Sequence, residues 1–252
     1  MLFFLKSNHR NCDEMPIAPL TTIIVMALGL MMSINIAFAD SEETASGEFR
    51  SFAKLSAEWQ QWALSIPAPE NPQLDATGQN CVVGQRGPIW FLAGIFGGGS
   101  ATRTCSVPEG KALYFPVINS VQINTPGVCG QPGALSVREL RDTATLFIDG
   151  ATNLSVTVDG IVIKKLRRVR SEVFVVALPE NNVFVEPCTV AGLGDVPPGV
   201  YSPAVDEGFY VLLNPLPLGP HALHFHAENP SAVPAFTLDV TYNLTVVPVL
   251  LK

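Results

Sequence analysis

The stretch F-T-L-D-V-T-Y-N-L-T-V, residues 236–246, decides the fold class of this chain. Every second position is apolar or aromatic, and threonine, aspartate or asparagine stands between them. Successive side chains of a strand point to opposite faces of the sheet, so this alternation predicts a long strand with one buried face and one wet face. Strands of this kind are typical of an antiparallel sheet layer.

Shorter segments of the same character fill most of the chain before this strand. Residues 88–95 and 104–118 are rich in β-branched and aromatic residues, with breaks at the glycines 97–99 and at residues 108–110. Residues 154–158 alternate in the same way, and Asp159-Gly160 is a two-residue hairpin sequence. The chain therefore predicts a mainly β fold, an antiparallel β-sandwich or jelly-roll-like domain.

Two segments have helical periodicity instead, so we expect two accessory helices on the β domain. Residues 48–64 place apolar side chains three and four positions apart, before the prolines at 67 and 69. Trp59 and Trp62 on this helix are interpreted as core residues, with a ligand-stacking pair as the alternative. The second helix is expected at residues 136–147, where Ser136 and a glutamate three residues later form a capping-box sequence.

The N-terminus has the pattern of a secretory leader. Residues 20–39 are an uncharged apolar run that ends in Ala37-Phe38-Ala39, the small-x-small pattern that signal peptidases cut. We expect residues 1–39 to be a cleaved signal peptide, with 1–14 an over-long start before Met15, and residues 40–252 to form one domain in a secreted or periplasmic protein. An uncleaved membrane anchor is the alternative, since the run is long enough to span a bilayer.

The charge of the chain bears on its partners. The formal net charge is −7 at pH 7, and an acidic protein repels phosphate backbones, so no nucleic acid partner is expected. We expect an envelope or extracellular ligand of unknown identity, and membrane contact only through an uncleaved leader. The basic residues in the seven positions 164–170 suit either an anionic glycan or lipid surface or a solvated sheet edge; they are Lys164, Lys165, Arg167, Arg168 and Arg170.

The cysteines predict disulfides. Four of them follow the predicted leader, and no C-x-x-C spacing occurs, so two disulfides are favoured over a metal-thiolate site in an exported protein. Neighbours in sequence close the shorter loops, which favours pairing Cys81 with Cys105 and Cys129 with Cys188. Each bond is expected to add about 3 to 4 kcal/mol by constraining the unfolded chain.

Three of the four histidines lie in G-P-H-A-L-H-F-H, residues 219–226. On a strand His224 and His226 share one face about 6.6 Å apart, a separation that one zinc or copper ion can bridge. Glu228 has the same parity and is the third candidate ligand if the chain bends after residue 227; no other cofactor is expected. In the alternative, His224 and His226 stand on a solvated face and His221 closes the turn before the strand. A pH-responsive contact is also open.

Acidic and aromatic residues form a second candidate site. Asp206 and Glu207 lie between Tyr201 and Tyr210, and aromatic residues beside acids suit sugar binding. A turn with solvated acids is the alternative. The further candidates for a binding surface made by loops are Trp90 and His221. No catalytic residue is predicted, because the sequence contains no nucleophile elbow, H-E-x-x-H helix or calcium loop.

The chain also resembles a known set of sequences. The resemblance rests on four motifs: W-Q-Q-W at 59–62, C-V-V-G-Q-R-G-P-I-W-F-L-A-G at 81–94, R-T-C-S-V-P-E-G-K at 103–111 and P-L-P-L-G-P-H at 215–221. With them the chain is similar to a family of uncharacterised exported bacterial β-rich proteins without an established activity. The resemblance implies an exported β-rich fold and nothing about a substrate.

These patterns favour a binding protein over an enzyme. The prediction is an exported, disulfide-braced, non-enzymatic binding or structural module of the cell envelope or extracellular space, whose loops meet the partner. The alternative is an extracytoplasmic enzyme, either metal-dependent through His224 and His226 or carbohydrate-active through its acidic loops.

Overall fold

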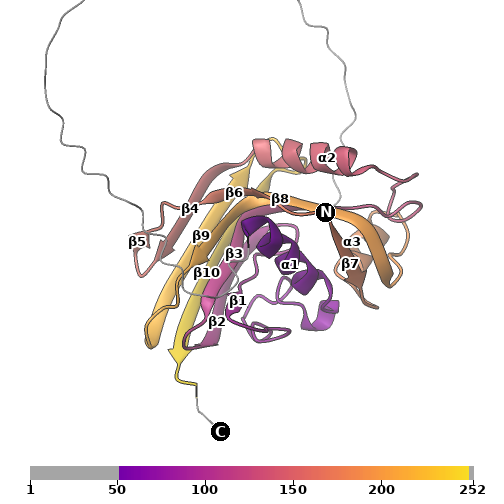
Figure 1. Ribbon diagram of the computed structural model, residues 1–252. Coiled ribbons are helices and arrows are strands. Elements are labelled where there is room, and N and C mark those ends of the chain that lie inside the picture. The colour runs from indigo at the N-terminus through magenta and orange to yellow at the C-terminus, as the bar shows by residue number, and fades with distance from the viewer. Residues whose placement is uncertain (1–50, 250–252) are drawn as a thin grey trace, which may run out of the picture. The chain divides into compact units, whose positions relative to one another are not determined.

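The computed structural model describes residues 51–249, drawn as the coloured ribbon in Figure 1. The alternating stretch at residues 236–246 lies in strand β10 (Phe236–Val247), in which every second side chain from Leu238 to Val246 is buried. The predictions for residues 1–39 lie outside the described residues, as do residues 48–50 of the first predicted helix. Within residues 51–249, no helix combines the length and the apolar composition needed to cross a bilayer.

The strands of the described residues form two five-stranded sheets. Sheet A has the order β1-β3-β8-β6, and β7 also pairs with β8; the bounds are β1 (Ile89–Phe91), β3 (Ala112–Ile123), β6 (Arg167–Arg170), β7 (Phe174–Leu178) and β8 (Gly199–Leu213). Sheet B has the order β2-β10-β9-β4-β5, with β2 (Gly99–Pro108), β4 (Thr152–Val158), β5 (Ile161–Val162) and β9 (Gly219–Asn229). The prediction of a mainly β fold is confirmed.

Both sheets are mixed, whereas the alternation of the sequence predicted antiparallel layers. β1 runs parallel to β3, and β2 runs parallel to β10. A tight turn forces two strands of one sheet to be antiparallel, but the turn at residues 109–111 joins β2 in sheet B to β3 in sheet A. The direction of β2 in its own sheet is therefore free of that constraint.

A shared apolar cluster lies between the two sheets. Phe115 of β3 and Phe225 of β9 are fully buried, and their ring centres are 5.0 Å apart. Val211 of β8 and Val240 of β10 belong to the same cluster. The odd-numbered residues of the central part of β8 face this cluster, so the even-numbered residues face the other side of sheet A.

Helix α1 (Phe52–Leu64) packs on that other side, as its apolar spacing predicted. The Ser51 hydroxyl accepts a hydrogen bond from the Lys54 N–H at 3.2 Å and so caps the helix. Trp59 and Trp62 are buried against sheet A, and each indole N–H donates to a backbone carbonyl. A short 3-10 helix, η1 (Ala68–Glu70), follows.

The described residues contain two further α-helices, α2 and α3. Helix α2 (Val137–Asp149) begins with the predicted capping box of Ser136 and Glu139. It packs on β3 and β8, and its buried residues are Leu140, Ala144 and Ile148. Helix α3 (Val185–Val190) was not predicted, because its six residues are too few for a helical period to be visible in the sequence. The prediction of accessory helices is confirmed, with one more than expected.

Two disulfides hold the loops to this framework. Cys81 is bonded to Cys105 and joins the long loop after η1 to β2. Cys129 is bonded to Cys188 and joins the segment after β3 to α3. Both pairings agree with the prediction from loop length.

Candidate functional site

A cavity of about 90 Å³ lies where α1, β3 and the glycine-rich segment after β1 meet. Its walls are mostly apolar, and the aromatic residues among them are Trp59, Phe96, Phe147, Phe184 and Phe236. Three carboxamide side chains interrupt these walls: Gln60, Gln73 and Asn119. The cavity therefore combines apolar walls with a few polar groups, which is the composition of small-molecule sites in proteins.

Gln73 is the polar residue of the wall that lacks a full set of partners. Its side-chain Oε1 is buried and accepts no hydrogen bond from any atom of residues 51–249. Its backbone carbonyl does accept a hydrogen bond, from the Phe96 N–H at 3.1 Å. This bond joins the loop at residue 73 to the segment at residue 96 in the cavity wall. Buried polar atoms in native proteins are almost always paired, so an unpaired acceptor at a cavity wall marks a position where a donor is favoured.

Behind the cavity wall lies a buried carboxyl group, Asp206 of β8. Its Oδ1 accepts hydrogen bonds from Gln60 Nε2 at 2.7 Å and from Asn119 Nδ2 at 3.3 Å. Its Oδ2 accepts one from the Tyr210 hydroxyl at 2.6 Å. Both carboxamides therefore turn their nitrogens towards Asp206, and a carboxylate, which can only accept, requires that orientation when Asp206 is ionised. Asp206 thus fixes the orientation of two polar groups of the cavity wall.

The burial of this group changes its acidity. Burial raises the pKa of Asp206 to about 7, against the lowering effect of its hydrogen bonds from Tyr210, Gln60 and Asn119. Burial also raises the pKa of Tyr210 well above its usual value, and the nearby Asp206 charge adds to the effect. The ring of Tyr210 stacks on Tyr114 at 5.2 Å. The pair of Asp206 and Tyr210 is therefore a protonatable unit enclosed between α1 and sheet A.

A glycine gives the chain room for this arrangement. A Cβ atom on Gly208 would lie 2.6 Å from the Ile118 carbonyl oxygen and 2.7 Å from Asn119 Cβ. The register of β3 shifts beside it, between residues 116 and 118. The absent side chain lets β3 approach β8 closely and brings Asn119 within reach of Asp206.

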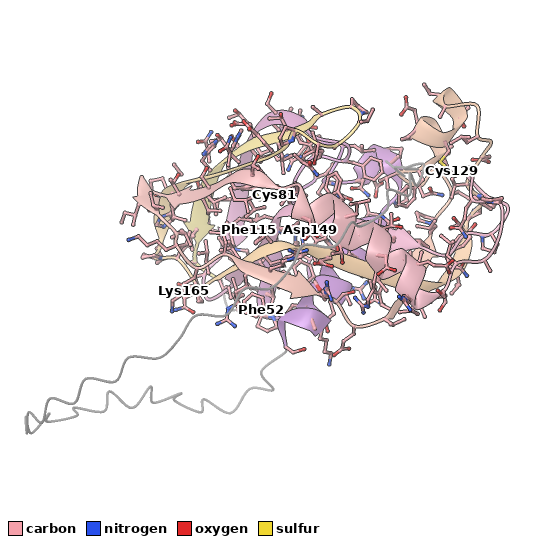
Figure 2. All side chains as sticks on the ribbon, turned by 90° about the horizontal axis from the view of Figure 1, so that it is seen from above. Phe52, Cys81, Phe115, Cys129, Asp149 and Lys165 are labelled. Carbon is pink, nitrogen blue, oxygen red and sulfur yellow. A yellow bond between two sulfur atoms is a disulfide. The ribbon has the colours of Figure 1, made fainter. Side chains whose placement is uncertain are left out.

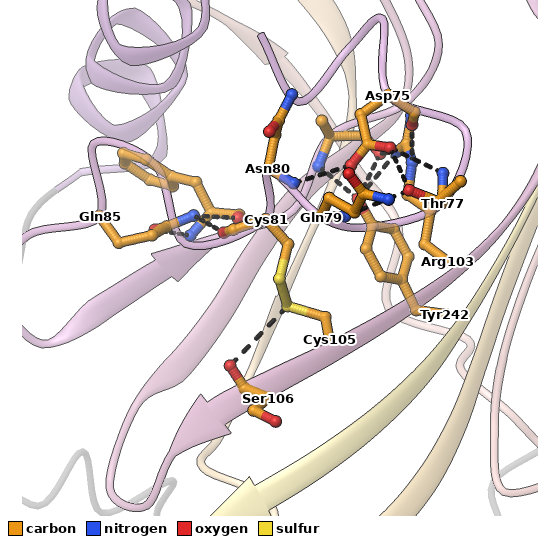
Figure 3. Close-up of a disulfide and its surroundings, with 12 residues drawn as sticks. Asp75, Thr77, Gln79, Asn80, Cys81, Gln85, Arg103, Cys105, Ser106 and Tyr242 are labelled. Atoms are coloured by element: carbon orange, nitrogen blue, oxygen red, sulfur yellow. Dashed lines mark hydrogen bonds between the residues drawn. A yellow bond between two sulfur atoms is a disulfide. The ribbon is translucent and has the colours of Figure 1, made fainter. Parts of the chain in front are cut away.

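A buried arginine holds the loop wall from the other side (Figure 3). Arg103 of β2 donates to the carbonyl of Asp75 from Nε at 2.7 Å and to the carbonyl of Gly94 from Nη2 at 3.1 Å. Its Nη1 donates to the Ala93 carbonyl and, at 2.8 Å, to the hydroxyl of Tyr242. The Cys81–Cys105 bond lies beside this cluster in the same view. One buried guanidinium thus connects the loop at residue 75, the start of the cavity wall and sheet B.

Glu207 lies on the opposite face of β8 from Asp206. Its carboxylate is 1% exposed and is paired with Arg168 at 2.6 Å and with Arg170 at 3.1 Å. The Thr145 hydroxyl of α2 donates to it at 2.6 Å. Neither acid lies in a turn, which was the alternative drawn from the sequence. Both lie in the middle of a long strand, and helices α1 and α2 cover its two faces.

The remaining acidic and aromatic candidates lie apart from the cavity. Tyr201, at the start of β8, donates from its hydroxyl to the Pro197 carbonyl at 2.8 Å. Trp90 is 6% exposed and belongs to the apolar cluster between the sheets, so it is not a loop surface residue. Of the predicted sugar-binding group, the structure brings together only Asp206 and Tyr210.

His221 closes a turn, as one sequence interpretation held. Its Nδ1 lies 2.7 Å from Asp159 Oδ2, and its Nε2 lies 2.9 Å from the Pro217 carbonyl oxygen. Both neighbours are acceptors, so only the protonated imidazolium can donate to both. The hydrogen bond to Asp159 is the largest cause that raises the pKa of His221 above its usual 6.5. This histidine links the β4–β5 turn to the turn before β9.

His224 and His226 stand on the outer face of sheet B. Asp239 of β10 lies between them, 3.3 Å from His224 Nε2 and 3.1 Å from His226 Nδ1. Glu228 approaches His226 Nε2 at 3.2 Å and accepts from Asn153 at 2.6 Å. Among residues 51–249, no group of three His, Cys, Asp or Glu side chains is placed to hold a metal ion. These contacts are imidazole–carboxylate pairs.

Several residues of the site escaped the sequence analysis. Gln73 and Asn119 belong to no motif, and their role arises only from contacts between distant segments. Gln60 had a signal, because it stands one turn after Ser56 and one turn before Ala63, on the margin of the apolar face of α1. Asp239 is one polar residue of the alternating stretch, with nothing in the sequence to set it apart.

Comparison of the chain with protein-family models, with curated proteins and with solved structures found no match.

Proposed function

We propose that this chain is a non-enzymatic binding protein of an extracytoplasmic compartment, secreted or periplasmic, and that its ligand enters the cavity beside α1. The two disulfides fit a protein of an oxidising, extracytoplasmic environment. The observation that carries the proposal is the largely apolar cavity, with five aromatic residues and three carboxamides in its wall, one of which has a buried, unpaired acceptor.

The size and chemistry of the cavity define the ligand in general terms. An apolar cavity of about 150 Å³ is known to hold benzene, so about 90 Å³ suits a smaller molecule or one end of a larger one. The aromatic walls favour an apolar or planar group. Gln73 Oε1 favours a hydrogen-bond donor, such as a hydroxyl or an amine. The ligand is thus a small apolar group that carries a donor.

The position of Asp206 supports binding over catalysis. Its pKa near 7 would suit a general acid or base, and such groups cluster at functional sites. A catalytic acid or base must nevertheless reach the substrate, whereas Asp206 lies behind Gln60 and Asn119 and both of its oxygens are occupied. Its role in the proposed function is to position the two carboxamides.

A ligand screen with a blocked variant tests this function. Ser120→Phe places a ring at the cavity wall, and Thr102→Phe places the same ring on the exposed face of β2 as the matched control. We expect compounds with an apolar group and one donor to raise the melting temperature of the wild type and of Thr102→Phe, and not that of Ser120→Phe. Gln73→Leu should lose most of the same shift.

Native mass spectrometry of the purified wild type supplies a second measurement. A bound small molecule that Ser120→Phe lacks would support the proposal. If no compound shifts the wild type, and no molecule is retained that the blocked variant loses, the cavity is a packing feature and the proposal is wrong.

The metal-dependent enzyme is the second candidate, and the observation in its favour is that Asp239 brings a carboxylate between His224 and His226. These three side chains are not placed to hold an ion as they stand, so a metal would have to displace the hydrogen bonds and rearrange the side chains. Metal analysis of untagged protein tests it. Stoichiometric zinc or copper that disappears in the His224→Ala, His226→Ala double variant would support the enzyme, and metal-free protein would remove it.

A further inference from the structure

Two turns meet at one end of sheet B and are fastened together. Asp159 and Gly160 form the turn between β4 and β5, and both have positive φ, as a two-residue hairpin turn requires. His221 joins this turn to the neighbouring one through Asp159 and the Pro217 carbonyl. The Ala222 N–H also donates to Asp159 at 2.8 Å. These hydrogen bonds fix the two turns relative to each other, and with them the positions of the side chains that they carry.

Large aliphatic side chains project from these turns into solvent. Ile161 is 70% exposed, Val162 is 60% exposed, and Leu218 of the neighbouring turn is 54% exposed. β5 is an edge strand of sheet B, drawn at the margin of the ribbon in Figure 1. Exposed β-branched residues on an edge strand favour aggregation. A group of exposed apolar residues at such an edge therefore indicates an interaction surface, for a protein partner or a membrane.

Positive charge lies directly beside these aliphatic residues. Lys164 and Lys165 follow β5, both are exposed, and neither forms an ion pair within residues 51–249. Arg168 and Arg170, further along, are paired with Glu207, and Asp159 is paired with His221. Figure 2 shows Lys165 at the end of the described residues opposite Cys129. We call Ile161, Val162, Leu218, Lys164 and Lys165 the basic tip.

We propose that the basic tip docks this protein on a lipid bilayer that contains anionic headgroups. The aliphatic side chains enter the boundary between headgroups and acyl chains, and the two ammonium groups contact lipid phosphates. A bilayer fits this tip better than a soluble polyanion does, because a polyanion offers nothing to cover the aliphatic side chains. The chain as a whole is acidic at −7, so the attraction comes from this end and orients the protein on the surface. The proposal does not depend on the cavity.

Vesicle sedimentation tests the basic tip with the full protein. We expect the wild type to sediment with phosphatidylglycerol-containing vesicles at low salt, and to be released at high salt, because screening weakens the attraction. Lys164→Glu with Lys165→Glu should lower the partition coefficient about tenfold or more. Ile161→Ser with Val162→Ser should lower it by a similar factor. All variants share the same N-terminal segment, so differences between them report on the tip.

Two matched controls change the same residue types elsewhere. Val190→Ser removes an equally exposed aliphatic residue on α3, and Lys54→Glu reverses an exposed charge on α1; both should bind like the wild type. Circular dichroism and melting temperature confirm that each variant is folded.

Three results would overturn the proposal. One is equal sedimentation of wild type and tip variants, and another is equal binding to pure phosphatidylcholine vesicles. The third is that soluble dextran sulfate releases the wild type and the Ile161→Ser, Val162→Ser variant from the vesicles equally well. That result would identify a polyanion site that does not require lipid.

Discussion

Asp206 is a single residue whose charge depends on pH near neutrality. Burial raises its pKa from 3.8 to about 7, so between these values the folded protein holds a proton that the unfolded chain has released. The free energy of unfolding therefore falls as the pH rises from about 4 to about 7, by up to about 4 kcal/mol. Below this range both states are protonated, and the loss is absent.

The Asp206→Asn variant has a neutral side chain at every pH, so it lacks this dependence. We expect its free energy of unfolding to increase relative to that of the wild type when the pH is raised from about 5 to about 8, as measured by urea denaturation. Asp142→Asn, on the exposed face of α2, is the matched control and should follow the wild type. A difference between wild type and Asp206→Asn that stays constant with pH would contradict the prediction.

His221 also makes stability depend on pH, but its charged form is a cation and its transition lies above pH 6.5. Its pKa is raised above 6.5 by the hydrogen bond to Asp159, so its stabilising contribution is complete below about pH 6.5 and is lost as the pH rises through the folded-state pKa. His221→Gln should therefore lower the melting temperature more at about pH 5.5 than at about pH 9. In an Asp159→Asn background the same substitution should show a weaker pH dependence. Equal effects at both pH values would count against the imidazolium.

The acids show what a sequence can and cannot reveal about a single residue. The triplet at 206–208, D-E-G, has the composition of a turn, and the sequence singled it out without revealing its burial. Asp206 tolerates burial because Gln60 and Asn119 donate to it, and Glu207 because Arg168 and Arg170 do. These partners come from other elements, so no local pattern announces them.

Among the elements, β8 depends on its glycine. Gly208→Ala would place a methyl group 2.6 Å from a carbonyl oxygen of β3, so the two strands must separate at the point where Asn119 reaches Asp206. We expect a loss of about 1 to 3 kcal/mol in urea denaturation. Gly133→Ala is the matched control, since a Cβ there meets nothing within 4 Å, and it should change stability by less than about 0.5 kcal/mol. Equal effects of both substitutions would refute the close approach.

Elements with a strong period were predicted well, and elements buried on both faces were not. β10 and α1 alternate or repeat cleanly because each has one buried and one open face. β8 has five consecutive buried residues, 204–208, because sheet A is covered on both sides there. Burial of that kind removes the alternation on which a strand assignment depends.

At the scale of the whole molecule, the disulfides limit the freedom of the unfolded chain. The bonded cysteines are separated by 24 and 59 residues, so the chain-entropy treatment expects stabilisation of about 3.5 and about 4 kcal/mol. Cys81→Ala with Cys105→Ala, and Cys129→Ala with Cys188→Ala, should lower the free energy of unfolding by these amounts. Thiol titration of the unreduced wild type checks the bonds directly, and free thiols at these four positions would contradict them.

The arrangement of the sheets could be predicted only in part. Composition and alternation gave the mainly β class, and cysteine spacing gave the disulfides. The order of strands was not accessible, because β2 and β3 share a tight turn yet belong to different sheets. The cavity was equally hidden, since its wall is assembled from α1, β3 and loops that meet only in the folded chain.

The parallel pairing of β2 with β10 also governs when the protein can become whole. Asp239 lies opposite Ser100 in this pair, so β2 cannot pair within its sheet until the distant strand β10 has been synthesised. Contacts between such remote positions slow the search for the native topology. Sheet B therefore stays incomplete until β10 is available, and the pairing of β10 with β2 is a late step in folding.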